Sequence, residues 1–179
     1  MITRKHMSRR SALKVLGASG TIAFGTGTAT ASEREEAVPT FFARLSDNPS
    51  IQGHGKVYSR GRGRLDLVGD TENGETVLHF ELTVANLEQG AFAAHIHGEG
   101  RADGDIWAGL YEGDPINNET ISGTIRNEDV ADDVGGVSEL IWDELVEGNG
   151  VVNVHTGFEP GGEIAGIVRP RPVGGWIAV

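Results

Sequence analysis

Short segments in which apolar and polar residues alternate recur along most of this chain, separated by Gly, Asn and Pro. A period of two sends apolar side chains to one face of a strand, and evenly spaced segments of this kind are typical of a sandwich or barrel. Nine strands are predicted, at 40–45, 55–60, 64–69, 75–86, 92–98, 105–112, 120–126, 151–156 and 163–169. We therefore expect an all-β sandwich or barrel, with enough strands for two facing sheets.

The segment ETVLHFELTV (75–84) illustrates how the alternation assigns side chains to faces. One face is wholly apolar and is expected to line the core; it consists of Leu78, Phe80, Leu82 and Val84. The other face, which includes His79, is expected to point outward. We interpret His79 as a solvated strand histidine rather than a metal ligand.

Two strand segments, TISGTIR (120–126) and EIAGIVR (163–169), match at Ile, Gly and Arg with equal offsets. We interpret them as two similar strands rather than as an internal repeat. Their glycines, Gly123 and Gly166, are expected where another backbone or a ring comes close.

One segment, VSELIWDELVEG (137–148), departs from the strand pattern. Its apolar residues have the spacing of a helix stripe, and Gly148 is placed to end the helix. The spacing predicts one short helix packed over the end of the sandwich. The stripe consists of Val137, Leu140, Ile141 and Leu145.

The N-terminal segment has the features of an export signal. Arg9 and Arg10 precede a weakly apolar run that ends in small residues, and the segment resembles a twin-arginine signal with Ala12 in place of the usual Phe. The resemblance implies export in a folded state, to the cell surface or the medium, with cleavage after Ala31. If the signal is cleaved, no stable membrane insertion is expected; if it is retained, it tethers the domain to the membrane.

These features divide the chain into a signal peptide at 1–31, a polar lead-in at 32–39, one domain at 40–170 and a tail at 171–179.

The net charge is −11 for the chain and −16 beyond residue 31, where 10 basic and 26 acidic residues remain. Nucleic acid is therefore not expected as a partner, because phosphate binding needs a basic face. Beyond residue 31, the acidic residues are dispersed and Lys56 is the only lysine, a composition typical of adaptation to high salt.

The chain contains no cysteine. Disulfides, thiol chemistry and zinc sites built from Cys are therefore excluded. The domain must be held together by its core.

Two histidines, His95 and His97, occupy one predicted strand two residues apart. Residues at this spacing lie on one face about 6.6 Å apart, so both rings are expected to point the same way and can converge on one ion. Imidazole nitrogens bind zinc or copper, and a third donor is available from His155 on another predicted strand. Thr156 and Asn153 are the residues expected to orient the rings from behind the ligand atoms. The alternative is that these histidines bond to backbone carbonyls and hold no ion.

The segments AHIHGEGRADGDIWAGL (94–110) and LVEGNGVVNVHTGFEPGGEIAGIV (145–168) are similar to the CHRD domain, over about Phe41 to Val168. The resemblance implies an immunoglobulin-like or related Greek-key fold in an extracellular setting. It also implies a binding or structural module with an unidentified extracellular or cell-surface ligand. Val151 stands where the family usually has Tyr, and Ala165 where it has Arg, which puts a binding surface at these positions in doubt.

The layout of the three histidines also resembles that of copper-zinc superoxide dismutases, where a His-x-His strand and a late histidine ligate copper. This resemblance implies a superoxide-dismutase-like barrel with a copper or zinc site at His95, His97 and His155. Redox activity at that site is part of what the resemblance implies. A bridging histidine after His97, a zinc-ligand loop and a cysteine pair are missing, so dismutase activity is not expected. No nucleophile elbow, HExxH or phosphate loop occurs either, which favours a protein that is not an enzyme.

Three further motifs have structural interpretations. The acidic residues of GEGRADGD (98–105) are expected in a polar turn rather than a calcium site. The arginines of RGRGR (60–64) are expected to pair with carboxylates. Asn118, in the sequence NET, fits a glycosylation acceptor, which would place it on an exposed loop.

Overall fold

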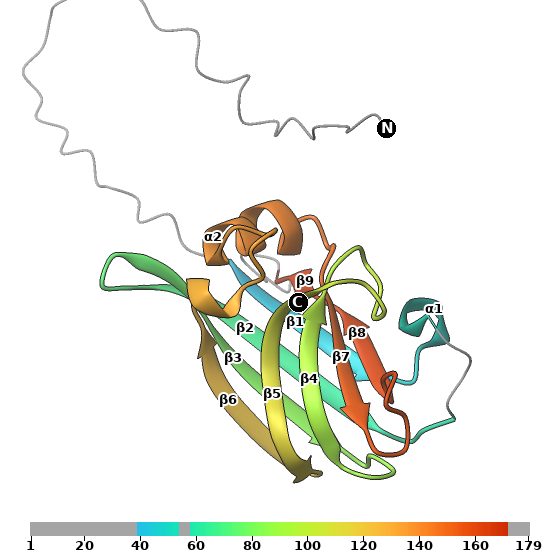
Figure 1. Ribbon diagram of the computed structural model, residues 1–179. Helices are drawn as coiled ribbons and strands as arrows, with labels where there is room; N and C mark the ends of the chain where they lie inside the picture. Colours follow the sequence, from blue (N-terminus) through green and yellow to red (C-terminus); the bar gives the residue numbers. More distant parts are fainter. Residues whose placement is uncertain (1–38, 54–57, 172–179) are drawn as a thin grey trace, which may run out of the picture. The chain divides into compact units, whose positions relative to one another are not determined.

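The computed structural model describes residues 39–53 and 58–171, and the described part of the chain folds as nine strands (Figure 1). All strand pairs are antiparallel. The strands are β1 (Thr40–Ser46), β2 (Arg62–Glu72), β3 (Glu75–Ala85), β4 (Ala91–His97), β5 (Ile106–Ile116), β6 (Glu119–Ile125), β7 (Val151–Thr156), β8 (Ile164–Ile167) and β9 (Arg169–Pro170). The predicted all-β class is confirmed.

The strands form one sheet in the order β5-β4-β7-β8-β1-β2-β3-β6, and β9 pairs with β1. The sheet curls until β4, β5 and β7 cross over β1, β2 and β3 (Figure 1). After β3 the chain makes β4 and β5 on the other side and then returns as β6 next to β3, which is a Greek-key crossover. A short turn joins the edge strands β5 and β6, so the sheet nearly closes into the expected Greek-key barrel.

The core lies between the two halves of the curled sheet. In β3, Leu78, Leu82 and Val84 are buried and Phe80 packs against them, as the alternation predicted. His79 points outward, where its Nδ1 lies 2.9 Å from Oγ1 of Thr124. The predicted core face is confirmed, whereas Val77, which the alternation places on the outward face with His79, is buried.

The predicted helical segment covers one end of the barrel (Figure 1). It begins as α2 (Val137–Glu139) and continues as a π-helical turn, η3 (Leu140–Leu145). The four residues of the predicted apolar stripe are all fully buried. Gly148 follows with φ +81°, a backbone conformation that glycine adopts without strain. The prediction of a helix that ends there is confirmed, although its second half is wider than an α-helix.

Two short elements were not predicted. The first, α1 (Pro49–Gln52), is a single turn that Asn48 caps by accepting a hydrogen bond from the Ser50 N–H, and Gly53 ends it with φ +72°. The second is the 3₁₀ turn η2 (Asn127–Asp129). The turn α1 matters for the site because it packs over the outer face of β8 through Ile51.

Two predicted strands differ from the structure. Of the strand expected at 55–60, residues 55–57 lie outside the described residues, and 58–60 are not in a strand. The strand expected at 163–169 is divided into two elements with different partners: β8 pairs with both β7 and β1, whereas β9 pairs with β1 alone.

The two matched glycines lie where a neighbour comes close. A Cβ at Gly123 would be 2.6 Å from the ring of Phe80, and a Cβ at Gly166 would be 2.3 Å from the carbonyl oxygen of Arg44. Real Cβ contacts do not occur at such distances. The interpretation of close approach by a ring and by a backbone is confirmed.

The export signal with Arg9 and Arg10, the lead-in up to residue 38 and the tail from residue 172 lie outside the described residues. Within 39–53 and 58–171, no helix is long and apolar enough to cross a bilayer. Asn118 is exposed in the turn between β5 and β6, with φ +56°, and its Oδ1 accepts a hydrogen bond from the Asn86 N–H. The expected exposed loop is present at this acceptor.

Candidate metal centre

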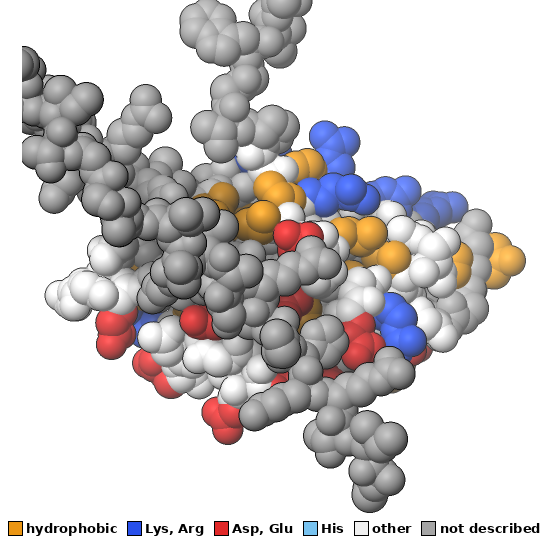
Figure 2. All heavy atoms as spheres, turned by 90° about the horizontal axis from the view of Figure 1, so that it is seen from above, with side chains coloured by type: hydrophobic (Ala, Val, Ile, Leu, Met, Phe, Trp, Pro, Cys, Tyr) orange, Lys and Arg blue, Asp and Glu red, His pale blue; other side chains and the backbone are white. Residues whose placement is uncertain are grey.

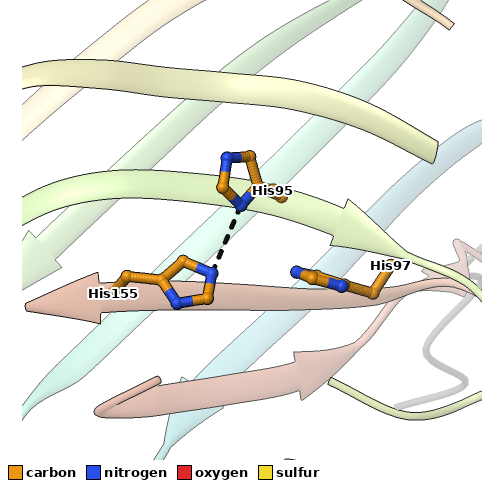
Figure 3. A group of neighbouring side chains, drawn as sticks. All are labelled: His95, His97 and His155. Atoms are coloured by element: carbon orange, nitrogen blue, oxygen red, sulfur yellow. Dashed lines mark hydrogen bonds between the residues drawn. The ribbon is translucent and has the colours of Figure 1, made fainter. Parts of the chain in front are cut away.

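The neighbouring antiparallel strands β4 and β7 carry the three histidines. His95 lies opposite Asn153, and His155 lies opposite Ala93. Since Ile96 and Val154 point into the core, the alternating residues His95, His97 and His155 emerge on the outer face. Figure 3 shows the three rings turned toward one another.

The three rings are close enough to share one ion. Their centroids are 5.7 Å (His95 to His97), 5.1 Å (His95 to His155) and 5.9 Å (His97 to His155) apart. One nitrogen from each ring lies within 4.8 Å of the others, so a common point exists no farther than 4.8 Å/√3, about 2.8 Å, from all three. Zinc–imidazole distances are about 2.0–2.1 Å, so small side-chain rotations would complete the coordination.

Backbone carbonyls determine which ring nitrogens are free to bind. Nδ1 of His97 lies 2.8 Å from the carbonyl oxygen of Gly104, and Nδ1 of His155 lies 2.8 Å from that of Pro160. Because a carbonyl only accepts, each Nδ1 carries the hydrogen and each Nε2 keeps its lone pair. Nε2 of His97 is buried without a partner, and Nε2 of His155 lies 3.2 Å from Nδ1 of His95.

The surroundings favour the neutral form of these rings. Burial, together with the nearby His155 and His97, lowers the pKa of His95 to about 4. Burial also lowers the pKa of His155, and the hydrogen bond to Pro160 opposes this shift in part. At neutral pH both rings are therefore uncharged, which is the form that coordinates metals.

Asn153 forms hydrogen bonds to the two loops beside the site and none to the histidine rings. This buried side chain donates from Nδ2 to the carbonyls of Ala102 at 3.2 Å and Gly161 at 2.9 Å. Residues 98–105 and 157–163 are thereby tied to the same strand. These two loops supply the carbonyls that hold His97 and His155.

Thr156 does not have the expected role beside His155. As the next residue in β7, it points to the opposite face of the strand, where it is fully buried. Its hydroxyl donates to Oε2 of Glu163 at 2.8 Å. The ring of His155 is held by Pro160 instead.

Glu163 is a buried carboxylate that the sequence analysis did not single out among the 26 acidic residues. It accepts hydrogen bonds from the hydroxyls of Ser59 and Thr156 and from the Glu88 N–H at 2.9 Å. The sequence feature that could have indicated its importance is its position in the Gly-Glu-Ile motif of the CHRD pattern. Glu163 connects three segments that are far apart in the sequence and is structural.

The positions at which the chain departs from the CHRD pattern lie under a loop. Val151 and Ala165 are buried against Ile51 of α1 and Ala102 of the 98–105 loop, in a small apolar cluster outside the main core. Neither side chain is available as a binding surface. A binding surface formed by the side chains at positions 151 and 165, which the sequence put in doubt, is therefore not present.

The arginines of 60–64 pair with carboxylates only in part. Nε of Arg64 lies 2.5 Å from Asp66, whereas Arg62 donates to the carbonyl of Gly61. Arg60 has no ion-pair partner among the described residues. The expected pairing therefore holds for Arg64 alone.

A nearly closed, antiparallel Greek-key barrel places this domain in the all-β class. The family profile of the CHRD domain matches residues 41–168, and the chain belongs to this family. No curated protein and no solved structure matched the chain. Family membership suggests a binding or structural module.

Proposed function

We propose that this CHRD domain binds one zinc or copper ion through Nδ1 of His95 and the Nε2 atoms of His97 and His155. The ion would replace the contact between Nδ1 of His95 and Nε2 of His155, and the hydrogen of the His95 ring would move to its Nε2. The observation that carries the proposal is the buried Nε2 of His97, which has no partner and lies beside two other imidazoles. Leaving such an acceptor unpaired costs about 1–3 kcal/mol, a cost that a bound ion would remove.

The surroundings of the three rings agree with this proposal. Carbonyls that hold the second nitrogen of a ligand histidine are usual around metal sites, and Gly104 and Pro160 are placed in this way. Imidazole suits both zinc and copper, and of the two, copper binds nitrogen sites more tightly when both are present. Three protein donors would leave a coordination position for water or an external ligand.

Metal analysis of the purified full chain tests this function. After chelator treatment and dialysis against zinc or copper, we expect about one equivalent of metal per chain. His97→Ala should weaken binding at least tenfold, because it removes one of three ligands. The matched control is His79→Ala, since His79 lies on β3 outside the cluster and should leave the stoichiometry unchanged. Less than a tenth of an equivalent in the unaltered protein would contradict the proposal.

We also propose that the domain works outside the cytoplasm, after export through the twin-arginine pathway. The paired Arg9 and Arg10 and the small residues up to Ala31 support this proposal. Replacing both arginines by lysine should retain the unprocessed protein in the cytoplasm. The exported protein should begin at Ser32 when its mass is measured; an unchanged distribution of the double variant would rule out this route.

A further inference from the structure

Arginines gather on the outer face of β1, β2 and β9, although the protein as a whole is acidic. Arg44 lies opposite Arg64, and Arg169 lies opposite Phe42, which places their side chains on the same face. Of the eight arginines in the described residues, five belong to this arginine face: Arg44, Arg62, Arg64, Arg169 and Arg171. Figure 2, seen from above, shows arginine side chains (blue) along one edge beside hydrophobic side chains (orange).

Only part of this positive charge is neutralised within the domain. Asp66 takes both Arg64, at 2.5 Å, and Arg171 as ion-pair partners. Arg44 and Arg169 have no carboxylate within ion-pair distance among residues 39–53 and 58–171. The guanidinium groups of Arg44 and Arg169 can therefore take an anionic ligand without first breaking an ion pair.

These two arginines line a pocket of about 230 Å³. Its other walls include the apolar side chains of Phe42 and Ile167 and the polar side chain of Asn48. Pockets for drug-sized molecules measure roughly 300–1,000 Å³, so this one has room for a single ring-sized group. A guanidinium fork matches the two oxygens of a carboxylate or a sulfate, and the apolar wall suits the body of a ring.

We propose that this pocket binds one acidic sugar unit of an anionic polysaccharide. Its carboxylate or sulfate is taken by Arg44 and Arg169, its ring lies against Phe42 and Ile167, and the polymer continues over the neighbouring arginine face. The pocket is separate from the histidine cluster, since it contains none of the three histidines. It adds a binding activity to the proposed metal site and does not depend on it.

Two other classes of polyanion fit less well. Single-stranded nucleic acid binds through several aromatic rings on which successive bases stack, whereas Phe42 is the one aromatic residue among those that line this pocket. An acidic peptide that adds a strand needs a free sheet edge, whereas β1 pairs with β2, β8 and β9.

Affinity electrophoresis of the full chain through gels that contain polygalacturonate, dextran sulfate or neutral dextran tests the proposal. We expect retardation by at least one acidic polysaccharide and none by neutral dextran. Which acidic gel retards the protein more strongly distinguishes carboxylate from sulfate recognition. The double substitution Arg44→Gln/Arg169→Gln should weaken binding at least tenfold.

The matched control is Arg101→Gln/Arg126→Gln, which changes the net charge equally at arginines outside the arginine face and should keep the affinity within twofold. Chemical denaturation verifies that both variants are folded. Chelator should not change the retardation, which separates this result from failure of the metal site. Absence of retardation, or an equal loss in both double variants, would overturn the proposal. Equal affinity for polyglutamate or oligothymidylate would also overturn it, since the surface would then be a general polyanion surface.

Discussion

Glu163→Ala is expected to destabilise the domain by about 4 kcal/mol, because it removes three hydrogen bonds to a buried carboxylate and leaves a cavity. Glu163 is fully buried, and the Glu88 N–H and the hydroxyls of Ser59 and Thr156 donate to it. Without the carboxylate, the Glu88 N–H loses its acceptor. Urea unfolding at constant salt concentration measures the change in the free energy of unfolding.

Glu163→Gln serves as the control for this experiment. It keeps the volume and one acceptor oxygen for Ser59 and Glu88, and its amide can donate to the hydroxyl of Thr156 after that hydroxyl rotates. We expect a loss of only about 1 kcal/mol. If Ala and Gln cost the same, the hydrogen bonds of Glu163 do not stabilise the fold in the way described here.

Gly166→Ala is expected to cost about 3 kcal/mol, because the new methyl group would lie 2.3 Å from the carbonyl oxygen of Arg44. The clash is with backbone rather than with a flexible side chain. The backbone of β1 cannot move away easily, since β1 is paired with β2 over its full length, Thr40–Ser46. Thermal and urea unfolding both measure the effect.

The matched control is Gly109→Ala in β5. Gly109 is exposed, and a Cβ there would meet no atom within 4 Å. Its unfolding free energy should stay within about 0.5 kcal/mol of that of the unaltered protein. If both substitutions lower the free energy of unfolding by a similar amount, the effect comes from strand propensity rather than from the contact with β1.

Several elements were predictable because their signals are local. The alternation at 151–156 predicted the bounds of β7, and the alternation in 75–86 predicted which side chains of β3 face the core. The spacing in 137–148 predicted the helical turn. Each of these patterns repeats over several residues, so a single misleading position does not change the outcome.

Other elements lacked such a signal. The turn α1 has four residues, too few for a periodic pattern. The division into β8 and β9 follows a change of pairing partners, from both β7 and β1 to β1 alone, and these partners come from other parts of the chain. The prediction that Thr156 orients the ring of His155 was wrong for a different reason. Neighbouring residues in a strand point to opposite faces, so Thr156 could not lie on the face of His155.

By itself, the sequence determined the all-β class, the CHRD family and the common face of His95 and His97, because strand periodicity and family motifs are properties of contiguous residues. Only the tertiary structure decided that β4 lies beside β7, which brings His155 to the pair. It also decided which carbonyls hold the rings, where Glu163 finds its donors and how arginines from β1, β2 and β9 come to share one face. These arrangements depend on distances between segments far apart in the chain, and such distances follow from packing rather than from local pattern.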